Sequence, residues 1–214
     1  AHRTSPTNIG MYLLATCCAR EFGWIDTTAL LARLAATLDT VDRMQKHRGH
    51  LFNWYDTQTL RPLPPDYVSS VDSGNLAGHL VAVAEACRAF AAEAGCLPPE
   101  QTALHTLAQR CDALHSGMDF SGLYDPKRHL FHIGLRVEEN MLDASYYDLL
   151  ASESRLLSFL AIAKGDVPRR HWMALGRPFL LVGSRPGLKS WSGSMFEYLM
   201  PPLGMSGPAP GLLQ

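Results

Sequence analysis

Apolar residues recur at steps of three and four in several separate stretches of this chain, which is the spacing of one face of an α-helix. Between residues 27 and 47 the stripe consists of Leu30, Leu34, Leu38 and Val41. Thr7 is available to cap an earlier helix, as short hydroxyl side chains do. We predict helices over residues 7–22, 27–47, 75–94, 100–116, 145–163 and 168–175.

Two aromatic and proline-containing stretches interrupt these helices. Residues 50–65 are extended and end in prolines, and residues 122–134 place Asp125-Pro126 between two short aromatic segments, which predicts a β-hairpin. Helical hairpins over 7–47 and 73–116 would then pack side by side. We therefore expect an all-α fold, a partial (α/α)6 toroid built of helical hairpins with short β-hairpin excursions, although the two hairpins share little sequence.

Charge and composition exclude several classes of function. A net charge of -1 and a pI of about 6.8 give no field that would attract nucleic acid. Charged residues interrupt the apolar stretch 76–94, so we expect no membrane span. The nine histidines include no HExxH motif and no glycine loop matches a nucleotide-binding motif, so we expect neither metal nor cofactor. Five cysteines without CxxC spacing indicate a reducing compartment.

Five segments at helix starts or in loops together gather aromatic rings with hydroxyl, amide and carboxylate groups. They are residues 4–8, 52–56, 70–75, 143–148 and 190–197. Sugars present apolar C–H faces edged by hydroxyls, so rings beside hydrogen-bonding groups suit a glycan groove. The alternative is that the polar residues are helix caps and the rings are core. The residues that we expect to contact a glycan are Asn8, Trp54, Tyr55, Asp72, Asn75, Asp143, Tyr146, Tyr147, Trp191 and Glu197.

Two glutamates are candidates for glycosyl-transfer chemistry, which uses a pair of carboxyl groups. Glu153 is expected mid-helix among small residues, where burial would raise its pKa toward that of a general acid. The alternatives are a solvent-exposed carboxylate or a partner of Arg155. Glu197 lies between apolar residues, which suggests a carboxylate in an apolar wall, or a buried salt-bridge partner.

Longer strings in the same segments resemble a known family. The chain is similar to the glycoamylase-like middle domain of bacterial cyclic β-1,2-glucan synthases. The matching strings are TSPTNIGMYLLA (4–15), FNWYDT (52–57), YVSSVDSGNLAGHL (67–80), VEEN (137–140), LDASYYDLLASESRL (142–156), AIAKGDVPRRHWMALGRP (161–178) and SWSGSMFEYLMP (190–201).

This resemblance implies a toroid domain over residues 1–201 and an irregular Pro/Gly-rich tail over 202–214. It implies that the parent protein lies in the bacterial inner membrane, with this domain in the cytoplasm. The domain would close linear β-1,2-glucan into rings by retaining transglycosylation. Glu153 would be the general acid/base, Glu197 a subsite or supporting carboxylate, and the nucleophile would lie beyond this chain.

The partners implied are β-1,2-linked glucan and the remaining domains of the synthase. Two alternatives stay open. The chain would then be a non-catalytic glycan-binding or scaffold fragment, or a helical interaction protein.

Overall fold

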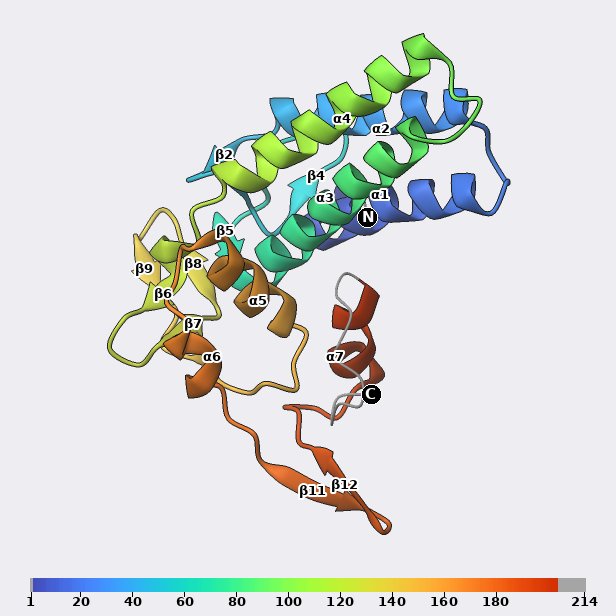
Figure 1. The fold of residues 1–214 in the computed structure, drawn as a ribbon. Coiled ribbons are helices and arrows are strands. Elements are labelled where there is room, and N and C mark those ends of the chain that lie inside the picture. The colour runs from blue at the N-terminus through green and yellow to red at the C-terminus, as the bar shows by residue number, and fades with distance from the viewer. Residues whose placement is uncertain (1, 204–214) are drawn as a thin grey trace.

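Four long helices make up most of the first 117 residues. The computed structural model describes residues 2–203 (Figure 1). The long helices are α1 (Pro6–Glu21), α2 (Thr27–Arg43), α3 (Ser70–Ala91) and α4 (Pro98–Gly117). Shorter helices follow: α5 (Arg155–Lys164), α6 (Arg170–Ala174), α7 (Met195–Leu199) and the 3-10 turns Phe120–Leu123 and Pro201–Leu203. The four helices predicted before residue 117 are confirmed, although the second one ends at Arg43 rather than at 47 and the third one spans Ser70–Ala91 rather than 75–94.

Short polar side chains set where these helices begin. Ser5 caps α1, because its Oγ accepts a hydrogen bond of 3.2 Å from the N–H of Asn8 and Pro6 follows at the first helical position. The prediction of Thr7 as this cap is therefore wrong, since Thr7 already lies inside the helix. Asp26 caps α2 in the same way, accepting from the N–H of Ala29 at 2.7 Å.

The helices are arranged in two layers. α3 packs against α1 on one side and α5 on the other, so these three form a row, while α2 and α4 contact each other and lie on α1 and α3 respectively (Figure 1). α3 is buried along most of its length, including every residue from Ser73 to Leu80. A helix that is buried nearly all round is surrounded by other elements.

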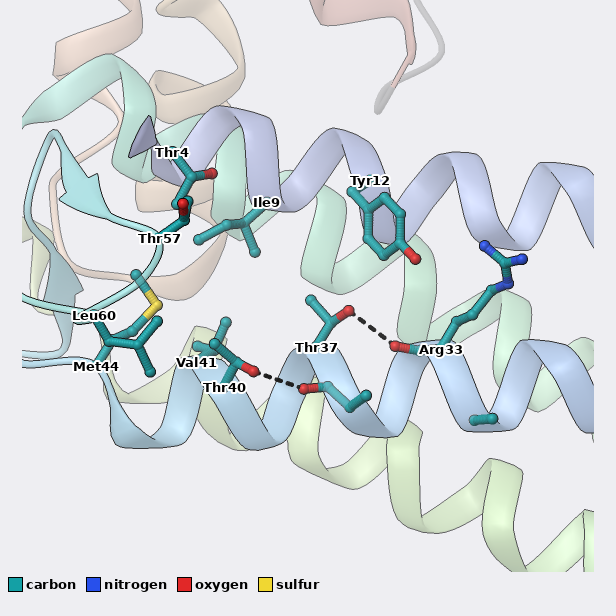
Figure 2. A pocket seen from close by; sticks show the side chains of 12 residues that line it. Thr4, Ile9, Tyr12, Arg33, Thr37, Thr40, Val41, Met44, Thr57 and Leu60 are labelled. Atoms are coloured by element: carbon teal, nitrogen blue, oxygen red, sulfur yellow. Dashed lines mark hydrogen bonds between the residues drawn. The ribbon is translucent and has the colours of Figure 1, made fainter. Parts of the chain in front are cut away.

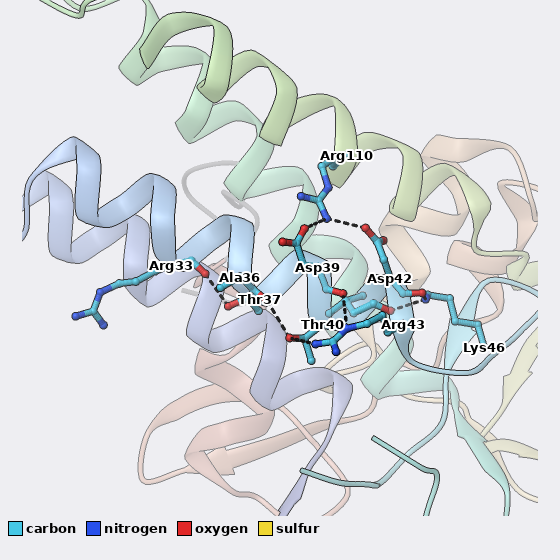
Figure 3. Close-up of polar contacts among 10 residues, drawn as sticks. Arg33, Ala36, Thr37, Asp39, Thr40, Asp42, Arg43, Lys46 and Arg110 are labelled. Carbon is cyan, nitrogen blue, oxygen red and sulfur yellow. Dashed lines mark hydrogen bonds and ion pairs between the residues drawn. The ribbon is translucent and has the colours of Figure 1, made fainter. Parts of the chain in front are cut away.

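Ion pairs tie the second layer together at the surface. Arg110 of α4 donates to Asp39 at 2.8 Å and to Asp42 at 2.6 Å, and both carboxylates belong to α2 (Figure 3). The carboxylates are more than half exposed. This contact therefore fixes the register of two helices more than it stabilises the fold.

The strands are short and all pair antiparallel. β1 (Arg3–Thr4) pairs with β4 (Tyr55–Asp56), and β2 (Lys46–His47) with β3 (His50–Leu51). Two three-stranded sheets have the orders β5-β8-β9 and β10-β7-β6. Their strands are β5 (Tyr67–Ser69), β6 (Tyr124–Asp125), β7 (Leu130–His132), β8 (Gly134–Arg136), β9 (Met141–Leu142) and β10 (Tyr146–Tyr147). The hairpin predicted over 122–134 is confirmed as β6 and β7.

The helix predicted over 145–163 is wrong in its first ten residues. Tyr146 and Tyr147 pair with β7 instead, and the backbone that follows is tethered to Gly176, whose N–H donates to Asp148 and whose carbonyl accepts from Leu150. These hydrogen bonds use backbone groups that a helix would need. The helix therefore starts only at Arg155 and ends at Lys164, where Gly165 caps it with a φ of 90°.

The last part of the described chain contains more structure than was predicted. β11 (Phe179–Val182) and β12 (Arg185–Leu188) form a projecting hairpin, and α7 follows it (Figure 1). Of the predicted tail 202–214, residues 204–214 lie outside the described residues. A second small core joins this region to the preceding loop. Its buried members are Leu150, Ala151, Leu175 and Leu188, with Trp172 and Tyr198 packed against them.

Candidate functional site

The first turns of α1 and α3 hold a network of polar side chains around Asp72. Thr7 donates to one carboxylate oxygen of Asp72 at 2.5 Å, and Ser69 donates to the other at 2.7 Å. Asn75 donates to the hydroxyl of Thr7 at 3.2 Å. Asn75 is only 2% exposed, and its Oδ1 has no hydrogen-bond partner among the described residues. These hydrogen bonds therefore hold Asp72 in a fixed position, and Asn75 Oδ1 is a buried acceptor without a partner among the described residues.

Glu153 lies in the turn just before α5, not in the middle of a helix as predicted. The segment 148–150 is held extended by Gly176, so the first helical turn begins only after Ser154. The side chain is half-buried. Burial raises the pKa of its carboxyl group, and the negative charges of Glu197 and Asp72 raise it further. The pKa is therefore shifted in the direction that suits a proton donor.

Tyr147 lies in the same region as these acids. Burial raises the pKa of its hydroxyl, and the charges of Glu153, Asp72 and Asp143 add to the effect. Asp143 accepts a hydrogen bond from the hydroxyl of Tyr67. Asp143 and Tyr147, two of the predicted glycan contacts, therefore lie near each other, and Tyr147 lies near Glu153.

Glu197 has surroundings unlike those that its sequence neighbours indicate. Its carboxylate accepts hydrogen bonds from serine hydroxyls and backbone N–H groups between Ser190 and Ser194, at distances from 2.6 to 3.3 Å. Burial by itself would raise the pKa, but the donors at Ser192 and Ser194 outweigh it and lower the pKa to about 2. The apolar wall expected around Glu197 is therefore wrong, because the apolar neighbours in sequence point elsewhere on α7.

An aromatic pair extends from this loop. The rings of Trp191 and Tyr147 are stacked with centroids 5.7 Å apart and an interplanar angle of 27°. The indole N–H of Trp191 donates to Asp148 at 2.9 Å. Trp191 is 49% exposed, so part of its ring remains available for a ligand. A flat ring beside carboxyl groups is an arrangement that can bind a sugar.

Other predicted ring contacts do not join this group. Tyr55 is fully buried, and its hydroxyl donates to the carbonyl of Gln45 and accepts from the N–H of Phe52, so the expectation that it lines a groove is wrong. Trp54 lies beneath the guanidinium of Arg3, whose central carbon is 4.3 Å from the ring centroid.

Two further predicted residues lie at the edges of the region. Tyr146 points to the opposite face of its strand from Tyr147, as neighbours in a strand do, and its hydroxyl donates to Asp125 at 2.9 Å. Asn8 is exposed on the first turn of α1, next to Thr7.

The residues that hold these acids and the Trp191 ring in place are not among the predicted glycan contacts. These are Thr7, Ser69, Tyr67, Asp148, Ser192 and Ser194. Their signal is faint, because short hydroxyl residues near helix starts are usually caps. Ser69 and Ser194 do cap α3 and α7, and they also donate to a carboxylate.

A hollow of about 550 Å³ lies elsewhere, between α1 and α2 (Figure 2). It is lined mainly by apolar groups and by threonines. The hydroxyls of Thr37 and Thr40 donate to the carbonyls of Arg33 and Ala36 in their own helix, each at 2.9 Å. They are therefore already engaged within α2, and this hollow lacks the acids and stacked rings found around Glu153.

Within residues 2–203, none of the helices combines the length and hydropathy needed to cross a membrane. The same residues contain no group of three or more histidine, cysteine, aspartate or glutamate side chains arranged to hold a metal ion.

Comparison with known proteins shows which proteins the chain is related to. No protein-family model matches it. It is 36% identical to the cyclic β-(1,2)-glucan synthase NdvB of Rhizobium meliloti (strain 1021), in an alignment of 328 residues that covers 100% of this chain. The chain spans only 12% of the length of that curated relative.

Solved structures share its fold. An endo-β-1,2-glucanase from Chitinophaga pinensis, in complex with sophorotriose and glucose, matches with a TM-score of 0.74 and 15% identity over 94% of this chain and 49% of its own. A mutant endo-β-1,2-glucanase from Talaromyces funiculosus, in complex with β-1,2-glucan, matches with a TM-score of 0.66 and 12% identity over 89% of this chain and 45% of its own. The chain is therefore a relative of one segment of a cyclic β-(1,2)-glucan synthase, and it has the fold of the endo-β-1,2-glucanases.

Proposed function

We propose that this chain is part of an α/α toroid that acts on β-1,2-glucan by retaining transglycosylation, closing linear chains into rings, with Glu153 as the general acid/base. The observation that carries the proposal is the half-buried carboxyl group of Glu153, whose pKa is raised beside Asp72 and Glu197. This site occurs in a chain that is related over its full length to a cyclic glucan synthase. The solved glucanases with this fold support the same substrate class.

The chemistry asks for a carboxyl group that is protonated when the glycosidic oxygen leaves. Burial and two neighbouring carboxylates raise the pKa of Glu153, a shift in the direction that favours this role. The oxygens of Asp72 and Glu197 already accept hydrogen bonds from Thr7, Ser69 and the serines of the 190–194 loop. The proposal therefore assigns neither of them as nucleophile and takes that group from elsewhere in the parent protein.

The layered packing supports the toroid. α1, α3 and α5 form a row with α2 and α4 outside it, which is the alternation of inner and outer helices that an α/α toroid requires. The domain in this proposal extends over residues 1–201, and the remaining domains of the synthase are its partners.

A second candidate function is glycan binding without catalysis. The exposed, stacked ring of Trp191 favours it, because an aromatic platform can hold a sugar ring whether or not a complete pair of carboxyl groups is present.

Incubation with linear β-1,2-glucan separates the two functions. Because the nucleophile is taken from elsewhere in the parent protein, turnover is measured with the parent synthase. The proposal expects cyclic or shortened products, detected by mass spectrometry, and their loss in Glu153→Gln while glucan binding is retained. Glu21→Gln is a matched control, since Glu21 is exposed at the far end of α1. Unchanged products from the Glu153→Gln synthase, with glucan bound by this chain, would instead support the non-catalytic function, and no binding of glucan by this chain would refute both.

A further inference from the structure

The carboxylate of Glu197 is surrounded by donors from a single loop. The hydroxyls of Ser190, Ser192 and Ser194 donate to it at 3.1, 2.6 and 3.0 Å. The backbone N–H groups of Trp191, Ser192 and Ser194 donate as well, at 3.0, 3.2 and 2.9 Å. Glu197 is 6% exposed. The carboxylate thus has little room to contact a ligand directly.

The same loop is fixed at its ends. The N–H of Gly193 donates to the Ser190 hydroxyl at 2.9 Å, and Gly193 adopts a φ of 72° that closes the turn. The N–H of Ser190 donates to the hydroxyl of Tyr198, which in turn donates to the carbonyl of Leu188 at 2.6 Å. The loop is therefore folded around the Glu197 side chain, with Trp191 carried on its outside.

We propose that Glu197 is a positioning residue, whose carboxylate holds the 190–194 loop in place. The loop then keeps the indole of Trp191 stacked on Tyr147 and hydrogen-bonded to Asp148. In this position the indole presents its exposed face to a glucose ring beside Glu153. The role of Glu197 in glucan binding rests on the proposed function. The role of Glu197 in positioning Trp191 does not, because the hydrogen bonds around its carboxylate form without a ligand.

The negative charge is needed for this role. A glutamine at this position keeps the shape and one acceptor oxygen but turns an NH2 group toward the ring of donors, leaving several of them unpaired. The charge also acts on Glu153, whose protonated form it favours. A neutral residue at 197 would therefore disturb both the platform and the acid.

The test uses the full chain labelled with 5-fluorotryptophan and observed by 19F NMR. The chain has four tryptophans, and Trp191→Phe assigns the Trp191 signal. Glu197→Gln is expected to shift or broaden that signal while the signal of Trp24, which follows the far end of α1, stays in place. Ser192→Ala and Ser194→Ala, which each remove one donor, should move it in the same direction but less. Glu21→Gln should leave it unchanged.

Binding of a linear β-1,2-linked glucose oligosaccharide is then measured by calorimetry. Loss of the stacked platform in Glu197→Gln is expected to weaken binding roughly threefold to tenfold, as for an aromatic contact. A Trp191 signal that is the same in Glu197→Gln as in the unaltered chain would overturn the proposal. If the unaltered chain does not bind the oligosaccharide, the proposed function fails, while the Trp191 signal still decides the role of Glu197.

Discussion

Gly74 lies where α3 packs most closely against α5, and replacing it with alanine tests the connection between the fold and Glu153. A Cβ at this position would lie 2.3 Å from Leu157 Cβ and 2.7 Å from its Cα. Carbon atoms in contact prefer a separation of about 3.5–4.0 Å. Because the Cα of Leu157 is backbone, the side chain cannot rotate out of the way, and α5 must shift.

The expected cost follows from two opposing terms. Overpacking a core costs about 1–3 kcal/mol, and alanine regains up to about 1 kcal/mol in helix propensity. The net effect should be a loss of about 2 kcal/mol, or a fall in Tm of about 4–8 °C for a chain of this size. Since α5 begins at Arg155, the shift should also displace Glu153 and weaken glucan binding.

Urea unfolding followed by circular dichroism measures the change. Gly117→Ala is the matched control, because a Cβ there meets nothing within 4 Å and the residue ends a helix. That control should be neutral or up to about 1 kcal/mol more stable. If Gly74→Ala is as stable as Gly117→Ala, the close packing of α3 on α5 is wrong, and with it the reason given for the position of Glu153.

Two further predictions concern charge. Burial lowers the pKa of the His79 and His171 imidazoles below the ordinary value of 6.5, so the unfolded chain takes up protons that the folded chain does not. Stability should therefore fall as pH drops below about 6.5, and the urea midpoint should be lower at about pH 5.5 than at about pH 7.5. Equal midpoints at the two pH values would contradict this prediction. Arg110→Ala should lower the free energy of unfolding by less than about 1 kcal/mol, because Asp39 and Asp42 are largely exposed, and this loss should shrink in high salt. A salt-independent loss above about 2 kcal/mol in the same unfolding assay would refute the prediction.

The segment 145–154 shows why part of the candidate site could not be predicted. Its residues include Leu149, Leu150 and Ala151, which favour a helix, and the prediction followed that local preference. In the fold, Gly176 takes the backbone hydrogen bonds of Asp148 and Leu150 from a distance of more than 25 residues along the chain. Glu153 consequently lies at a helix start rather than on a helix face.

Glu197 gives the complementary case. Its neighbours Phe196 and Tyr198 indicated an apolar wall, but the donors come from serines three to seven residues earlier, which a turn at Gly193 folds back onto the carboxylate. Sequence spacing alone does not show such a turn. The capping pattern of Ser194 with Glu197 is a visible part of the signal.

The sequence by itself determined the helices α1 to α4, the β6–β7 hairpin and the polar–aromatic segments, because stripes at helical spacing, caps and turn residues act within a few positions along the chain. Only the tertiary structure decided which of these segments meet. Asp72, Tyr147, Glu153, Trp191 and Glu197 come together because α3 packs between α1 and α5 and because backbone hydrogen bonds from Gly176 redirect the loop before α5. Tyr55 is excluded from the group because its hydroxyl is satisfied inside the core.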